Sequence, residues 1–257
     1  MNRRHVLAVL AVGLLVTMAG CAAIFGGISD EELDREQDYD DLKDRDADVV
    51  IDVESGGLIG GGEFRAVYDL NDTDELSLYR SSFYREVALD IHSVRYWYPD
   101  GTELTGSELE VDQGRSSTDI RVPDGNGTLA FSGATGTRTF NLPAYTEGSY
   151  EVLLPDGYRS SNLLFGASGP SGYEREVVDD TERLYWEHND GTINLRYYQP
   201  RDIVVFVGVV GVSVVLGGAG IAYYHRQVKR LQEKREEMGL DVDIDDDSDR
   251  GPPPGFK

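Results

Sequence analysis

The sequence predicts a mainly β fold, an antiparallel sandwich or barrel-like ectodomain, followed by one C-terminal transmembrane α-helix. Three observations lead to this prediction. Short runs rich in β-branched and aromatic residues alternate between apolar and polar positions through the middle of the chain. Pro-Asp-Gly turn triplets separate several of these runs. A single long apolar stretch without charge follows the last run.

Residues 1–20 have the pattern of an export signal. Arg3 and Arg4 precede an apolar segment, 6–16, that is too short to cross a bilayer. Two arginines followed by apolar residues resemble a twin-arginine signal, which implies export of an already folded protein. Residues 18–21, Met-Ala-Gly-Cys, resemble a lipobox, so we expect Cys21 to carry a lipid and to become the mature N-terminus. The alternative is an ordinary signal in which Cys21 is incidental.

Residues 21–47 are predicted to form a lipidated N-terminus and an acidic stalk. Ten carboxylate residues lie between positions 30 and 46. Their mutual repulsion favours an extended chain that would lift the folded domain off the membrane. A short amphipathic helix through Leu33 and Leu42 is the alternative. The run lacks the glycine-centred loop and closing glutamate of a calcium site, so we predict no metal here.

Residues 48–200 are predicted to form the extracellular β domain. Its expected strands are short and have an apolar period of two. These strands are 49–53, 64–68, 87–91, 94–98, 109–111, 120–122, 129–131, 137–142, 150–154, 184–187 and 193–198. Asn189-Asp190-Gly191 predicts a hairpin turn shortly before the membrane. We expect a long loop at 158–173, in which 163–165, Leu-Leu-Phe, would dock on the domain or contact a partner.

Ile203–Tyr224 is the predicted transmembrane helix. At about 1.5 Å per residue its length is about 33 Å, enough to cross the hydrocarbon core of a bilayer. Tyr197 and Tyr198 precede it, at the position where interfacial aromatic residues are expected. The alternative is a buried core helix, but an uncharged apolar run of this length is typical of a membrane span.

The charges on the two sides of this helix predict its orientation. Arg226, Lys229 and Arg230 follow it, whereas Arg201 and Asp202 before it cancel each other. The positive-inside rule therefore places residues 225–257 in the cytoplasm and the β domain outside. Within 225–257 we expect a basic helix and then an acidic, proline-rich disordered tail.

Small residues recur four positions apart within the transmembrane helix. Ser213 is followed by Gly217, and Gly218 by Ala222. This spacing lets two helices approach closely, so weak self-association through this face is a candidate interaction. The alternative is that glycine is simply common in membrane helices.

The chain is strongly acidic, with 47 Asp and Glu against 24 Lys and Arg and a formal net charge of −23. Nucleic-acid binding needs a basic face, so this composition argues against it. Only four of the basic residues are lysines, and acids are spread along the whole chain. This pattern resembles proteins of salt-loving archaea, whose repelling surface carboxylates are screened by salt. Cys21 is the only cysteine, which excludes a disulfide framework.

No catalytic or metal-binding motif is present in the predicted ectodomain. His92 and His188 are its two histidines, and both lie where structural or surface histidines are ordinary. No nucleophile elbow, paired cysteines or His-x-x-x-His pattern accompanies them, so we predict no cofactor and no metal. Asn71-Asp72-Thr73 and Asn126-Gly127-Thr128 match the N-glycosylation pattern and fall in polar turns, which makes Asn71 and Asn126 candidate acceptors.

In layout, the chain resembles cell-surface lipoproteins of haloarchaea that belong to uncharacterised families and carry a C-terminal transmembrane helix. The resemblance implies a location and no active site. We therefore predict a non-catalytic surface module that contacts membrane lipid and binds another envelope protein or a glycan. Two alternatives remain open at this stage: a surface hydrolase with a site around His92 and His188, and a receptor subunit that relays binding to the cytoplasmic helix.

Overall fold

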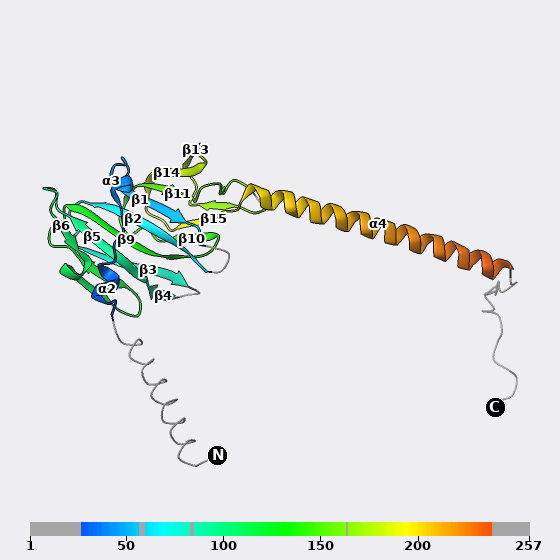
Figure 1. The fold of residues 1–257 in the computed structure, drawn as a ribbon, viewed down its shortest axis with the longest axis horizontal. Helices are drawn as coiled ribbons and strands as arrows, with labels where there is room; N and C mark the ends of the chain where they lie inside the picture. The colour runs from blue at the N-terminus through cyan, green and yellow to red at the C-terminus, as the bar shows by residue number, and fades with distance from the viewer. Residues whose placement is uncertain (1–26, 57–59, 83–84, 163, 238–257) are drawn as a thin grey trace, which may run out of the picture. The chain divides into compact units, whose positions relative to one another are not determined.

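The computed structural model describes residues 27–56, 60–82, 85–162 and 164–237 (Figure 1). It confirms the predicted fold class, because the described residues form three β-sheets and one long apolar C-terminal helix. The chain divides after Pro200 into two compact units, of which the first holds the β-sheets and the second holds the helix.

The largest sheet has eight strands in the order β13-β14-β11-β1-β2-β9-β5-β6. In this order the strands are Glu174–Val178, Thr181–Asn189, Gly148–Leu153, Val49–Glu54, Gly62–Leu70, Gly127–Thr135, Ile91–Trp97 and Glu103–Thr105. Every neighbouring pair is antiparallel except β1 and β11, which are parallel. The predicted antiparallel pairing therefore holds in this sheet except at the β1–β11 pair. β1 is buried on both faces for most of its length, as is typical of a central strand in a parallel pair.

Two smaller sheets complete the domain. The first has the order β10-β15-β12, formed by Thr139–Leu142, Ile193–Arg196 and Ala167–Gly169. The second has the order β4-β3-β8-β7, formed by Arg85–Ala88, Glu75–Ser82, Thr118–Arg121 and Glu110–Gln113, with a 3₁₀ turn, η2, at Gly106–Glu108. β12 shows that the predicted loop at 158–173 contains a short strand.

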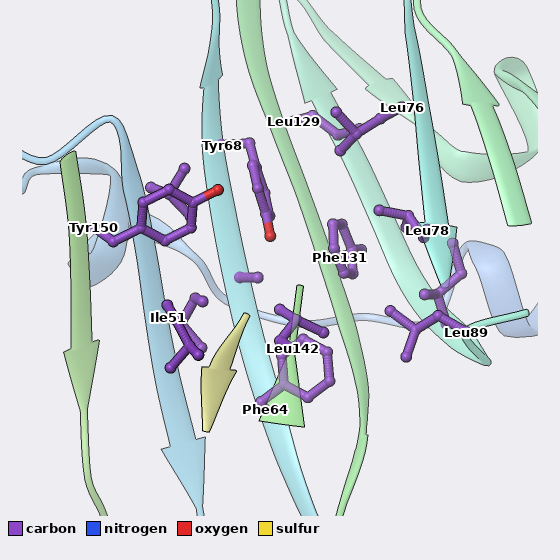
Figure 2. Packing of buried hydrophobic residues seen from close by; sticks show 14 of the residues in the cluster. Ile51, Phe64, Tyr68, Leu76, Leu78, Leu89, Leu129, Phe131, Leu142 and Tyr150 are labelled. Carbon is purple, nitrogen blue, oxygen red and sulfur yellow. The ribbon is translucent and has the colours of Figure 1, made fainter. Parts of the chain in front are cut away.

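The main core lies on one face of the eight-stranded sheet. Figure 2 shows Ile51, Phe64, Tyr68 and Phe131 pointing to this face together with leucines from β3 and β10. The rings of Tyr68 and Phe131 stack with their centroids 5.5 Å apart. Alternating strand residues reach the same face, so the period-two pattern of the sequence becomes a single apolar layer.

The prediction of a hairpin at Asn189-Asp190-Gly191 is wrong. β14 pairs with β11 and β13, whereas β15 pairs with β10 and β12, so the turn carries the chain from one sheet to another. The buried Asn189 side chain closes the turn: its Nδ2 donates to the Gly191 carbonyl at 3.1 Å, and its Oδ1 accepts from the Gly191 N–H at 3.2 Å. The predicted turn at Asn189-Asp190-Gly191 is therefore present, but the strand that follows it, β15, pairs with β10 and not with β14.

The prediction of an extended stalk is wrong for residues 29–47, which we call the strap. The strap contains two short helices, α2 (Asp30–Leu33) and α3 (Asp40–Lys43), and it packs on the β domain. Leu33, Tyr39 and Leu42 are all buried. Tyr39 and Leu42 form a second apolar cluster with Val50, Val67, Ala130 and Leu153, which lie on the face of the large sheet opposite the main core. We call this the outer face.

Two arginines and one tyrosine hold the acidic strap against the sheet. Arg65 donates two hydrogen bonds to Asp41, at 2.9 and 3.0 Å, and one to Asp52 at 2.6 Å. Arg95 donates to strap carbonyls, including that of Asp34 at 3.0 Å. The Tyr39 hydroxyl reaches the Ser93 carbonyl at 2.7 Å. Buried apolar area and neutralised carboxylates outweigh the repulsion that would otherwise extend this segment.

The second unit consists mainly of α4, Pro200–Glu237. This helix is long and apolar enough to cross a membrane, and its apolar window is entirely exposed, unlike the core helix of a soluble domain. The prediction of one C-terminal apolar helix is thereby confirmed. The helix continues past the predicted span to Glu237, and Tyr223 and Tyr224 are exposed on it.

Candidate functional site

A groove of about 710 Å³ lies on the outer face, beside the strap. It crosses β13, β14, β11 and β1, which are consecutive strands of the large sheet (Figure 1). The strap closes one side through Asp41 and Arg45. The turn between β13 and β14 closes another through Asp179, which has a left-handed φ of 49°.

The groove combines apolar and acidic surfaces. Its apolar lining residues are Val53, Leu153, Leu154, Pro155 and Val178. Its carboxylate side chains are those of Asp41, Asp52, Glu54, Asp156, Glu176 and Asp179. Arg45 and Arg183 are the two basic lining residues, so the lining has a formal net charge of −4. Charges gathered on the low-dielectric walls of a cleft concentrate ions of the opposite sign, so the groove favours a cation.

Both groove arginines are occupied by one buried carboxylate. Glu151 on β11 is 2% exposed, and each of its oxygens pairs with one guanidinium, that of Arg45 or that of Arg183. The Arg183 pair is 2.9 Å long. The hydrogen bond to Glu151 raises the pKa of Arg183. Both guanidinium groups are engaged by Glu151, and Arg183 also lies 3.6 Å from Glu176, so little of their hydrogen-bonding capacity is left for an anionic ligand.

Arg65 joins the strap to the edge of the groove. Burial lowers its pKa, but its hydrogen bonds to Asp41 and Asp52 more than compensate, so the pKa stays above its ordinary value. Its Nε lies 3.5 Å from a Glu54 oxygen without forming a hydrogen bond. Of the three carboxylates around Arg65, Glu54 is the one that accepts no hydrogen bond from it, so it is the least constrained.

The structure does not bring His92 and His188 together. His92 is on β5 and His188 on β14, five strand positions apart in the large sheet, or about 24 Å at a spacing of about 4.8 Å per strand. Burial, followed by the nearby Arg35 charge, lowers the pKa of His92. His188 is exposed. The hydrolytic site suggested around both histidines is therefore not formed.

A buried serine–glutamate cluster lies beneath the 158–173 loop. Glu182 on β14 is fully buried and accepts hydrogen bonds from the Ser160 hydroxyl at 2.5 Å and from the Ser160 N–H at 3.2 Å. Arg175 Nε lies 3.1 Å from the same carboxylate. Ser168 adds a hydroxyl contact to Ser160 at 2.8 Å. Ser160 is itself 3% exposed, so this network holds the loop against the sheet and gives no access to a substrate.

No group of three or more His, Cys, Asp or Glu side chains suited to a metal ion is present within the described ranges. Strap carboxylates that have a partner contact a basic side chain, a hydroxyl or a backbone N–H group. Asp34, for example, accepts hydrogen bonds from Ser107 Oγ at 2.7 Å and from the Ser107 N–H at 2.9 Å, and these bonds lower its pKa.

The two sequons lie next to each other. Asn71 and Asn126 are both exposed, and the Asp72 N–H donates to Asn126 Oδ1 at 3.4 Å. The Thr73 N–H donates to the Gly125 carbonyl at 3.1 Å, which joins the two turns. Whether either asparagine is glycosylated remains a prediction.

The other predicted site residues belong either to α4 or to the N-terminal segment. Arg226, Lys229 and Arg230 are exposed on α4, as are Gly217, Gly218 and Ala222. The Ser213 hydroxyl donates to the Val209 carbonyl of the preceding turn at 2.8 Å, so its proton is already used within the helix. Arg3, Arg4 and Cys21 lie outside the described residues, and the export signal and lipid site stay predictions.

Tyr197 and Tyr198 are not interfacial in the way the sequence suggests. Both are buried in the β domain, where Tyr197 packs on Tyr158 and Tyr198 on Phe165. The predicted loop at 158–173 therefore docks through Phe165. Leu164, by contrast, is 74% exposed.

A family model matches residues 45–243, which include almost the entire β domain and the apolar part of α4. The chain belongs to this family. Its description is "Family of unknown function (DUF5803)". The match begins after most of the strap and covers every groove residue except Asp41. No curated protein matches the chain.

Sequence reasoning did not find the groove. The groove gathers carboxylates from segments that are far apart in the sequence. These segments are the strap, β1, the residues after β11, β13 and the β13–β14 turn. The available signal was indirect: Leu33, Tyr39 and Leu42 at intervals in an acidic run indicate a segment with a buried side.

Proposed function

We propose that this protein is a membrane-anchored extracellular lipoprotein whose β domain is a non-catalytic binding module for a cationic partner. The groove carries this proposal, because it joins apolar surface to a lining with a formal net charge of −4, and the two arginines of that lining are both bonded to the buried Glu151. A basic, partly apolar segment of another envelope protein has the matching chemistry. A neutral glycan matches the lining less well, since most of its polar groups are charged.

The proposed anchoring has two parts. α4 crosses the membrane with residues 225–257 in the cytoplasm, and a lipid on Cys21 holds the other end of the ectodomain in the outer leaflet. The acidic composition, poor in lysine, supports a haloarchaeal origin and a high-salt environment. A single lipid chain binds membranes only marginally, so retention depends mainly on α4.

The groove is tested by removing two of its charges. In the full-length protein, Glu54→Gln with Asp179→Asn should weaken binding of a tetralysine peptide about two- to thirtyfold, because each exposed charge contributes roughly 0.2–1 kcal/mol. Glu86→Gln with Asp112→Asn is the matched control, since it removes the same charge from exposed positions on β4 and β7. Calorimetric titration measures all three proteins. Equal affinities for the two variants would contradict the proposal.

The anchoring is tested separately. Cys21→Ser should abolish metabolic labelling by a lipid precursor and leave the protein in the membrane fraction. Release of this variant into the medium would show that α4 does not retain the chain.

The continuity of α4 favours one second candidate, a subunit that relays binding to the cytoplasm. The helix is unbroken from Pro200 to Glu237, so a movement at its start would reach the basic residues after the span. Under this alternative, deletion of residues 225–257 should change the partners recovered from membranes. An unchanged set would refute it.

A further inference from the structure

The end of the β domain that is joined to α4 carries one prominently exposed apolar side chain, Leu164. We propose that the described residues of 158–169 form a membrane-contact loop, in which Leu164 inserts into the headgroup boundary of the leaflet that α4 enters. The proposal rests on the membrane-spanning part of the proposed function and is independent of the groove and of Cys21.

The first argument is that the loop is fastened to the last residues before α4. The Arg159 and Tyr198 backbones exchange two hydrogen bonds, both 2.9 Å long. The rings of Phe165 and Tyr198 lie 6.1 Å apart, and Ala167 pairs with Arg196 in the β12–β15 ladder. The loop therefore cannot move far from Tyr198 without breaking the domain.

The second argument is the short path from Tyr198 to the span. Two residues lead to the start of α4 at Pro200, and three more lead along the helix to Ile203. At about 3.5 Å per extended residue and about 1.5 Å per helical residue, this path is at most about 12 Å. The polar headgroup layer on each side of a bilayer is roughly 5–8 Å thick. Chain connectivity alone thus keeps Tyr198, and the loop attached to it, close to the headgroups.

The third argument is the charge of the segment. Residues 157–173 contain no Asp or Glu, in a chain that has 47 of them. The only charged side chain in this stretch, Arg159, is paired with Asp180 at 2.6 Å. A segment without carboxylates of its own reduces both repulsion by anionic lipids and the cost of moving a charge toward hydrocarbon.

The fourth argument is that the aromatic residues at this end of the β domain are packed within it. Tyr197 and Tyr198 are buried within the domain, and Phe165 packs on Tyr198, so none of them is free to contact lipid. Leu164 is left as the exposed large apolar residue among the described residues of this end. A single exposed leucine elsewhere would need no explanation, but here it lies in the position where interfacial apolar residues are expected.

The test places one fluorescent label at each of three positions in full-length protein carrying Cys21→Ser, reconstituted into vesicles of phosphatidylcholine and phosphatidylglycerol. Leu164→Cys reports on the loop. Asp190→Cys is the exposed control, at the opposite end of β15. Val212→Cys reports on the middle of α4. Acrylamide on both sides of the bilayer quenches each label according to its access to water.

We expect the quenching constant at position 164 to be several-fold lower than at 190 and to approach that at 212. If 164 is quenched as strongly as 190 while 212 is protected, α4 spans the membrane and the loop proposal is wrong. If 212 is also quenched, the membrane-spanning function fails, and the loop proposal fails with it. Because Leu164 is exposed in the fold, its substitution leaves the domain core unchanged.

Discussion

Tyr68→Phe should stabilise the β domain, whereas Tyr39→Phe, the same chemical change at another buried site, should destabilise it. Tyr68 is fully buried, and its hydroxyl has no hydrogen-bond partner among the described residues. Burial raises its pKa well above the ordinary value, so the group stays neutral. Figure 2 shows its ring between Tyr150 and Phe131, within the apolar core. An unpaired buried hydroxyl costs about 1–3 kcal/mol, and the substitution removes that cost.

Tyr39 presents the opposite case. Its hydroxyl donates to the Ser93 carbonyl and contacts Ser132 Oγ, both at 2.7 Å, and both partners are buried. Removing the hydroxyl would leave these two groups unpaired, so the unfolding free energy should fall by about 1–3 kcal/mol. For a domain of this size, each kcal/mol shifts the melting temperature by about 2–4 °C.

The assay is thermal unfolding of the full-length protein in detergent and high salt, followed by the fluorescence of its two tryptophans, Trp97 and the buried Trp186. The two variants should shift in opposite directions from the wild type. A lower melting temperature for Tyr68→Phe would refute the reasoning, since it would mean that the hydroxyl is satisfied, for example by an internal water. An unchanged melting temperature for Tyr39→Phe would show that the hydrogen bonds of the Tyr39 hydroxyl do not stabilise the domain.

Three further predictions concern the strap, acidity and loop packing. Arg65→Gln should lower the unfolding free energy by about 1–3 kcal/mol, because it removes the charged hydrogen bonds to Asp41 and Asp52. Amide hydrogen exchange in the strap should then become faster. Unchanged exchange would contradict the idea that Arg65 holds the strap on the sheet. Burial, and then the Asp48 charge, raise the pKa of Asp69 in the folded protein, so the unfolding free energy should fall as pH rises from about 3.9 through the folded-state pKa. Asp69→Asn should remove that fall. Parallel plots of unfolding free energy against pH for the two proteins would contradict this prediction. In Gly166→Ala the new Cβ would collide with the Ser160 carbonyl oxygen, so we expect a loss of about 1–3 kcal/mol, and a melting temperature equal to the wild type would argue against this packing.

Features that depend on residues close together in the sequence could be predicted from it, whereas features that depend on distant residues could not. Alternation along each strand is a property of neighbouring residues, so most of the strands could be predicted. Four observed strands, β3, β6, β12 and β13, were not among the predicted runs. The apolar run of α4 is also local, because each residue there satisfies its backbone within the helix. In two of the three Pro-Asp-Gly turns the glycine has the predicted left-handed φ, 85° at Gly101 and 76° at Gly157, whereas Gly125 in the third turn does not.

Pairing between distant elements was decided only in three dimensions. The repulsion of ten carboxylates predicts an extended stalk, but Arg65 and Arg95, which come from strands β2 and β5, attract that segment to the sheet. Asn189-Asp190-Gly191 has the chemistry of a tight turn, yet its two strands belong to different sheets because β15 pairs with β10.

By itself, the sequence determined that this protein is a β domain joined to an apolar helix, and that its surface is acidic. The export signal, a lipid on Cys21 and glycosylation at the two sequons stay predictions from the sequence alone. Only the tertiary structure decided that the strap folds back, that His92 and His188 lie apart, and that an acidic groove opens on the outer face. The physical reason is that periodicity and turn chemistry depend on residues close together in the sequence. The groove and the contacts that hold the strap depend instead on which distant side chains the strand order of the sheet brings together.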